Sequence, residues 1–184
     1  MRIILAAALS VAIVGVALAQ VQHLPRGVAT DIANAEIMAA ARKNPGAPVS
    51  DIQLRVLSIN NEYNVAVGVV QRAKTVRQSV GGSEHSQITE IYHVISGSGT
   101  LLTGGSLAAP EERDPNHEAV RNLTGPSTQG KEILNGTSRT IKAGDVVVIP
   151  PNTPHTFTEI TEELAYLVVR MDPKKVLPAG YVGK

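Results

Sequence analysis

The sequence contains no cysteine, no tryptophan and only one phenylalanine. Without cysteine there are no disulfides, so a folded domain must rely on its apolar core, which a chain of 184 residues is long enough to build. The scarcity of aromatic rings argues against sugar binding by stacking. The 17 basic and 16 acidic residues nearly balance, and no basic cluster is present. Nucleic acid and anionic membranes are therefore not expected as partners.

Charged residues are also missing from a stretch near the N-terminus. After Arg2, residues 3–18 carry no charge and are almost wholly apolar. Ala17-Leu18-Ala19 then matches the small-x-small cleavage pattern of a secretory signal. The run is shorter than the roughly 20 residues that span a bilayer. We expect a mature chain that begins at Gln20 in the periplasm or outside the cell, with no membrane attachment after cleavage. An uncleaved anchor is the alternative.

The part of the chain after the signal is expected to begin with a linker and a helix in residues 20–50. Thr30 or Asp31 can cap this helix, and Asn44-Pro45-Gly46 ends it just after Lys43. Its apolar face is expected to comprise Ile32, Ala35, Met38 and Ala39.

Residues 51–171 show the pattern of many short strands separated by turns that contain glycine and proline. Such a pattern is typical of a β-sandwich or β-barrel. The strands are expected at residues 52–56, 65–70, 88–95, 100–103, 146–149, 156–160 and 163–171. Residues 106–130 carry charges and turn formers but no sustained apolar period. We interpret them as a lid over a cavity mouth rather than as part of the sheet. Residues 172–184 form a tail.

Two segments each combine an apolar run with imidazole or carboxylate side chains near a turn. The first runs from His85 through Glu90 to Gly97, and the second runs from Gly144 to His155. Two imidazole nitrogens and one carboxylate oxygen form a ligand set that suits a divalent transition metal. We therefore predict that His85, Glu90 and His155 bind one such ion, with Fe, Mn and Zn as the candidates.

The first segment resembles the first motif of the cupin superfamily. That motif is Gly, five residues, His-x-His, three or four residues, Glu, six residues and Gly. Glu90 and Gly97 match its end, and His85 matches the second His. Ser83 stands where the first His belongs, and the leading Gly is absent. Ser83, Glu84 and Gln87 compete for the vacant ligand position.

The second segment resembles the second cupin motif, which is Gly, five residues, Pro-x-Gly, two residues, His, three residues and Asn. Gly144, Pro150 and His155 match this motif. Asn152 replaces the inner Gly and is expected to adopt the turn conformation that Gly would take. Glu159 replaces the final Asn. The resemblance implies an all-β fold: a double-stranded β-helix (cupin or jelly-roll) barrel with a short N-terminal helix. A homodimer is expected.

Strand alternation sorts the remaining candidate residues. Tyr92 shares a face with Glu90 and is able to donate a hydrogen bond; core filling is the usual role of such a residue, with contact to substrate as the alternative. His93 faces the other way and is expected to be structural or at a subunit interface. Alternation also places His155 on one face with Glu159. Gln87 is a candidate contact to substrate or water, and a solvated surface side chain is the alternative.

These features predict an exported cupin metalloprotein that transforms a small organic substrate as an oxygenase, isomerase or lyase. The alternative is a non-enzymatic cupin that binds a ligand, or a metal-free one, and Ser83 in place of the first His is its main support. Cupins include both classes, so the fold alone does not decide between them.

Overall fold

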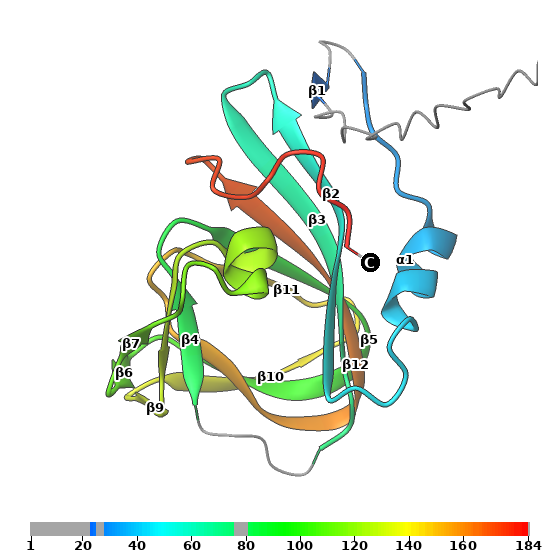
Figure 1. Cartoon of the computed structure of the whole chain (residues 1–184). Coiled ribbons are helices and arrows are strands. Elements are labelled where there is room, and N and C mark those ends of the chain that lie inside the picture. Colours follow the sequence, from blue (N-terminus) through cyan, green and yellow to red (C-terminus); the bar gives the residue numbers. More distant parts are fainter. Residues whose placement is uncertain (1–22, 25–27, 76–80, 184) are drawn as a thin grey trace, which may run out of the picture.

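The computed structural model describes residues 23–24, 28–75 and 81–183 (Figure 1). The predicted signal and its cleavage site lie outside these residues. No helix in the described ranges is long and apolar enough to cross a membrane. The helices are α1 (Asn34–Ala41) and the one-turn π-helix η1 (Val120–Thr124). The strands are β1 (His23–Leu24), β2 (Val49–Ile59), β3 (Tyr63–Arg72), β4 (Gly82–His85), β5 (Thr89–Thr103), β6 (Ser106–Ala108), β7 (Glu111–Glu112), β8 (Ser127–Gly130), β9 (Glu132–Leu134), β10 (Thr137–Lys142), β11 (Val146–Ile149) and β12 (His155–Asp172).

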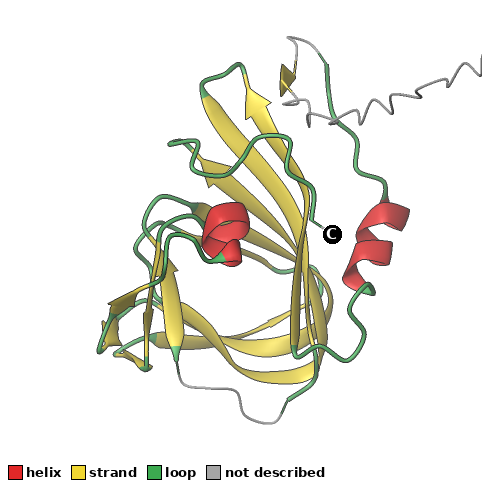
Figure 2. Cartoon of the chain, viewed as in Figure 1, coloured by secondary structure: helices red, strands yellow, loops and turns green. Residues whose placement is uncertain are grey.

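Two long strands, β5 and β12, organise the barrel (Figure 2). β12 pairs antiparallel with β5 along most of its length, and its second half also pairs with β3. β5 pairs in addition with β10 and β11, while β2 adds to β3. At its start β12 meets β4, where His155 lies opposite Ser83. The predicted all-β barrel with a short N-terminal helix is confirmed.

Each of the two long strands was expected as two shorter ones, and bulges explain the difference. Gly97 has a φ of 78°, and a side chain there would place its Cβ 1.9 Å from the carbonyl oxygen of Glu163. Glycine at this position therefore lets β5 bend without ending. A register shift between Phe157 and Glu159 breaks the alternation in β12. The prediction that Glu159 shares the face of His155 is consequently wrong, because the fully buried Ile160 takes the next inward position.

The barrel interior is filled by apolar side chains from β3, β5, β10, β11 and β12, which leaves one end for polar residues. The buried cluster comprises Val70, Tyr92, Val94, Leu101, Ile141, Val147, Ile149, Phe157, Ile160, Leu164, Tyr166 and Val168. Tyr92, Phe157 and Tyr166 form a continuous aromatic group, with ring centroids 4.5 Å and 5.9 Å apart along it. Most of the few aromatic residues of the chain therefore lie together in the barrel interior, beneath the polar end.

The helix α1 lies against the outer face of β2 and β3 (Figure 1). It begins after Ala33, which provides no side-chain cap, so the predicted cap at Thr30 or Asp31 is not formed. Ile37, Ala40 and Ala41 pack against Ile52, Leu54 and Val69. Ala35 and Ala39, expected on the buried face, are exposed instead. With only eight residues, the helix gains its stability from this packing rather than from its ends.

The segment 106–130 is more ordered than the sequence pattern indicated. Its last part, β8, pairs with β4 over four residues and thereby extends the main sheet, and β7 pairs with β8. β6 pairs with β9 in a separate ribbon. Side chains of this segment line the polar end of the barrel. The expectation that the segment stays out of the sheet is wrong, since β8 is a sheet strand.

Candidate metal centre and its cavity

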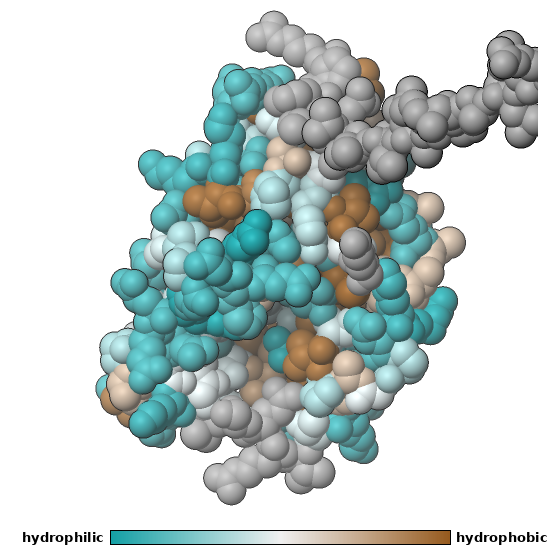
Figure 3. All heavy atoms as spheres, in the orientation of Figure 1, coloured by the Kyte–Doolittle hydropathy of each residue, from teal (hydrophilic) through white to brown (hydrophobic). Residues whose placement is uncertain are grey.

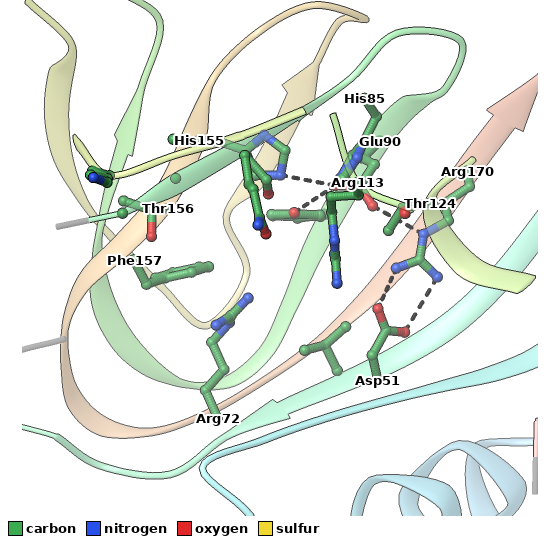
Figure 4. Close-up of a pocket in the computed structure, with 18 of the residues that line it drawn as sticks. Asp51, Arg72, His85, Glu90, Arg113, Thr124, His155, Thr156, Phe157 and Arg170 are labelled. Carbon is green, nitrogen blue, oxygen red and sulfur yellow. Dashed lines mark hydrogen bonds and ion pairs between the residues drawn. The ribbon is translucent and has the colours of Figure 1, made fainter. Parts of the chain in front are cut away.

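The three predicted ligands come from three strands and meet at the polar end of the barrel (Figure 4). His85 ends β4, Glu90 is the second residue of β5 and His155 begins β12. Their side chains are buried, with exposed fractions of 6%, 3% and 9% respectively. One ligand atom from each lies within 4.8 Å of the other two. Residues separated by up to 70 positions are thus brought together by strand pairing alone.

The hydrogen bonds of both histidines leave the Nε2 atom of each ring facing the centre. Nδ1 of His155 lies 3.0 Å from the backbone carbonyl oxygen of Thr153, so it carries the hydrogen and donates. Nδ1 of His85 lies 2.9 Å from Oγ of Ser127, and that hydroxyl donates its own hydrogen to the carbonyl of Gly125 at 2.7 Å. The Ser127 oxygen must therefore accept from His85. A neutral imidazole whose Nδ1 donates in this way keeps its Nε2 lone pair available for a cation.

The distance from Glu90 to His155 falls within the range for one shared ion, and the distance from Glu90 to His85 is slightly longer. Oε2 of Glu90 lies 3.4 Å from Nε2 of His155 and 3.8 Å from Nε2 of His85. Atoms that bind one ion at about 2.0–2.2 Å lie roughly 3–3.5 Å apart. The two rings approach edge to face, with centroids 5.1 Å apart. Burial lowers the pKa of His85 from 6.5 to about 4, with Glu90 opposing the shift, so its ring is neutral near pH 7 as a metal ligand must be.

The carboxylate of Glu90 is also held by protein groups. Its Oε1 accepts from Nε of Arg170 at 3.0 Å, and its Oε2 accepts from the hydroxyl of Tyr92 at 2.7 Å. Burial would raise the pKa of Glu90, but contact with His155 and the charge of Arg170 outweigh it and keep the pKa well below the usual range. Burial and the neighbouring Glu90 charge raise the pKa of Tyr92 well above 10, so its hydroxyl stays protonated as a donor. Glu90 is therefore anionic with or without a cation.

Arg170 links Glu90 to a second carboxylate beneath the site. Its guanidinium donates to Glu90, to Oε1 of Gln53 at 2.9 Å and to both carboxylate oxygens of Asp51. The side chain of Arg170 is 2% exposed. Burial opposes its charge, but Asp51 and Glu90 outweigh the effect and raise the pKa of Arg170 above its usual value. The buried charge of Arg170 thus partly neutralises both Asp51 and Glu90, and its hydrogen bond holds Oε1 of Glu90 in place.

A cavity of about 530 Å³ opens onto the three ligands. Figure 3 shows this face of the molecule as largely hydrophilic around a hollow, with a few apolar residues at its edge. The lining includes Ser83, Tyr92 and Thr156 beside the ligands, and Arg113 and Gln129 from the segment 106–130. A small organic molecule fits this volume, and it would contact both the ligand atoms and several cationic side chains.

The candidates for the vacant ligand position and for substrate contact differ in placement. Ser83 and Tyr92 line the cavity, whereas Glu84 and Gln87 are not among its lining residues. Gln87 lies in a bend after β4, so its position does not support a contact to substrate. Asn152 has a φ of 57°, which confirms the expected turn conformation just before His155. His93 is exposed on the outer face of β5, away from the ligands.

Several residues of the site escaped the sequence analysis. Arg170 lies on the buried face of β12 with Tyr166 and Val168, so a charged residue inside an apolar alternation was the available signal. Ser127 gave no signal, because a single serine in a loop-like stretch is common. Arg72 and Arg113 also line the cavity. Arg72 ends an apolar strand, and this position is only a weak sequence signal for a residue of the site.

Comparisons with known proteins found one domain profile and several solved structures that are similar to this chain. The profile of the AraC-like ligand binding domain matches residues 129–179. No protein of curated function matches the sequence. Among solved structures, oxalate oxidase in complex with glycolate is similar at 19% identity and a TM-score of 0.48, over 82% of this chain and 65% of that one. A Bacillus halodurans protein has 14% identity and a TM-score of 0.44, over 86% and 91% of the two chains.

The DMSP lyase DddQ from Ruegeria pomeroyi is similar at 18% identity and a TM-score of 0.38, over 60% of this chain and 40% of the lyase. The chain thus spans less than two thirds of the lyase and of the oxalate oxidase that it resembles. The barrel formed by β5 and β12, the two motif segments at one end of it and the matched domain profile agree on one architecture. The chain has the cupin fold.

Proposed function

We propose that this protein is a metal-dependent cupin enzyme that transforms a small organic substrate, with His85, Glu90 and His155 as the metal ligands. The observation that carries the proposal is the orientation of both imidazoles. Each has its Nδ1 engaged by a protein oxygen and its Nε2 directed at the same carboxylate oxygen of Glu90. Metal-binding histidines are usually fixed by such a bond from the second ring nitrogen.

A divalent ion at this position would act as a Lewis acid or, if it is iron, bind oxygen, and either role fits an oxygenase, isomerase or lyase. Fe, Mn and Zn are all compatible with two imidazoles and one carboxylate. Three protein ligands would leave room for substrate at the ion, and Ser83, which stands at the position of the first His of the cupin motif, lines the cavity. Tyr92 supports the arrangement by holding Oε2 of Glu90.

Metal analysis of wild-type protein and of two matched variants tests the proposal. Purified protein is incubated with Mn²⁺, Fe²⁺ or Zn²⁺, desalted and measured by emission spectrometry. We expect about one ion per chain in the wild type and loss of the ion in His155→Ala, accompanied by a lower Tm in the presence of metal. His93→Ala is the control, because His93 lies on the opposite face of β5 and is exposed. Equal metal content in both variants would refute the ligand assignment.

A second candidate function is a metal-free cupin that binds a ligand. The observation in its favour is that Glu90 already has Arg170 and Tyr92 as partners, so its buried charge needs no cation. The matched profile also describes a ligand-binding domain. Wild-type protein that takes up none of the three metals would favour this second function.

We also propose that the protein is exported to the periplasm or beyond. The support is the uncharged run at residues 3–18 and the small residues that follow it.

A further inference from the structure

Arg72, at the end of β3, has no acidic partner in the cavity that it lines. All 16 aspartate and glutamate residues of the chain lie in the described ranges, and none forms an ion pair with Arg72. Arg170, in contrast, is paired with Asp51 and Glu90. A half-buried guanidinium without a counter-charge is costly unless an anion from outside compensates it.

The guanidinium of Arg72 is held in place by two aromatic residues. Its Nε lies 3.2 Å from the hydroxyl oxygen of Tyr166 and donates to it. Its Cζ lies 4.7 Å from the centroid of the Phe157 ring, which gives a cation–π contact. These contacts engage Nε and one flat face of the group. The two Nη atoms have no hydrogen-bond partner among the described residues, and Figure 4 shows Arg72 pointing into the cavity beside Phe157.

An arginine fixed in this way presents two parallel N–H donors to one planar or tetrahedral oxyanion. Such paired donors match a carboxylate or a phosphate, and the bond strength is about twice that of a neutral pair. Because the ring of Phe157 and the hydroxyl of Tyr166 already restrict the side chain, little rotamer freedom is lost when an anion binds.

The other charged side chains of the cavity also favour binding of an anion. Arg113 and Lys131 also line it, and neither forms an ion pair within the described part of the chain. The acidic lining residues are Asp51 and Glu90, which Arg170 engages, and the exposed Glu111. The free cations therefore outnumber the free anions, and the cavity attracts negative charge.

We propose that the cavity binds a small organic acid whose carboxylate or phosphate group is held by Arg72, with Arg113 contributing from the segment 106–130. The oxyanion occupies the side of the cavity lined by Arg72 and Phe157, and the rest of the molecule extends toward His155 and Glu90. As an assignment of substrate class this rests on the proposed function, but the binding itself needs no metal.

Matched probes test the proposal on the full chain by titration calorimetry or ligand-observed NMR. Succinate is compared with its neutral diamide, and glycerol 3-phosphate with glycerol, so that the carboxylate and phosphate arms are separate. We expect one anion to bind wild-type protein and its neutral counterpart to fail. Arg72→Gln should weaken that anion about tenfold to a hundredfold, the range expected for charge-assisted hydrogen bonds. Arg139→Gln is the control, because Arg139 is exposed on β10 outside the cavity.

A second variant keeps the test valid if Arg72→Gln fails to fold. Arg72→Lys retains the charge but not the two parallel donors, so it should fold and still bind the anion more weakly than wild type. The proposal is overturned if neither anion binds, if the neutral probes bind equally well, or if the anion binds both Arg72 variants as tightly as it binds Arg139→Gln.

Failure of this proposal and failure of the metal proposal give different results. Anion binding is measured after chelation and again after addition of Mn²⁺, and metal content is measured in Arg72→Gln. Anion binding that depends on Arg72 in a protein without metal uptake would refute the enzyme proposal and leave the anion site standing. Normal metal uptake, together with anion binding that the Arg72 variants do not change, would refute the anion site and leave the metal proposal standing.

Discussion

Removal of the Arg170 guanidinium offers a quantitative test of the network that supports Glu90. Arg170→Met keeps much of the side-chain volume but deletes the donors to Glu90, Gln53 and Asp51. Glu90 is 3% exposed and Gln53 is fully buried, so neither can replace the lost donor with bulk water. Breaking a buried ion pair from one side costs about 3–5 kcal/mol of unfolding free energy. For a domain of this size the Tm should fall by about 6–20 °C.

Urea unfolding followed by circular dichroism measures the loss, with chelator present to remove metal. Arg55→Met is the matched control, since Arg55 also lies on a strand and pairs with one carboxylate, that of Glu36. That pair is partly exposed, so its loss should cost no more than about 1 kcal/mol. A similar, small loss in both variants would refute the reasoning, because it would show that the buried charge of Glu90 and the partly exposed charge of Asp51 tolerate the absence of Arg170.

The same experiment responds to a bound cation. Without Arg170, Glu90 lacks its main counter-charge, and a divalent ion at Oε2 would supply one. Added Mn²⁺ should therefore recover part of the lost stability in Arg170→Met. No recovery is expected once His155→Ala is added to the variant. Recovery that persists in the double variant would place the ion elsewhere.

Three further predictions concern the ligands and the N-terminus. Ser127→Ala should weaken Mn²⁺ or Zn²⁺ binding about 10–100-fold in a chelator competition assay, because it removes the acceptor that orients His85, whereas Ser86→Ala, at an exposed neighbour, should leave it unchanged. In metal-free protein the unfolding free energy should decrease as pH falls from 6.5 toward 4. The reason is that His85 takes up a proton in the unfolded chain but not in the native protein, where its pKa is about 4. In His85→Gln, the unfolding free energy measured with urea should change less over this pH range. Intact mass of protein from its native host should correspond to a chain that begins at Gln20, and a full-length species in the membrane fraction would contradict the export proposal.

The parts of the site that sequence predicted are those fixed by short-range pattern. The spacing of Glu90 from Gly97 and of His155 from Gly144 is set within single strand-turn units, so the sequence carries it directly. Alternation placed Tyr92 on the face of Glu90, and the structure has them hydrogen-bonded at 2.7 Å. These inferences need only the period of a strand and the residue types that a metal prefers.

The parts of the structure that the sequence did not predict depend on contacts between segments that are far apart in the sequence. The bulge after Phe157 lies where β12 pairs with Leu101 and Thr100 of β5, and no local pattern encodes that pairing. The polar strand β8 was interpreted as loop because its side chains face a polar cavity and its partner β4 is also polar. Apolar periodicity detects only strands that have an apolar face to bury. Arg170 was missed for a related reason, since its partners come from β2 and β5.

The two carboxylate oxygens of Glu90 have different partners, and this difference connects the proposed metal site with the proposed anion site. Arg170 holds Oε1, while Oε2 faces the two imidazoles, so the carboxylate is charged and oriented before a cation arrives. Together Asp51, Glu90 and Arg170 leave one net negative charge, which a divalent ion would more than cancel. A loaded centre would then attract an organic anion more strongly than the metal-free cavity does. Because such coupling is reciprocal, the anion held at Arg72 should also tighten metal binding by the same factor.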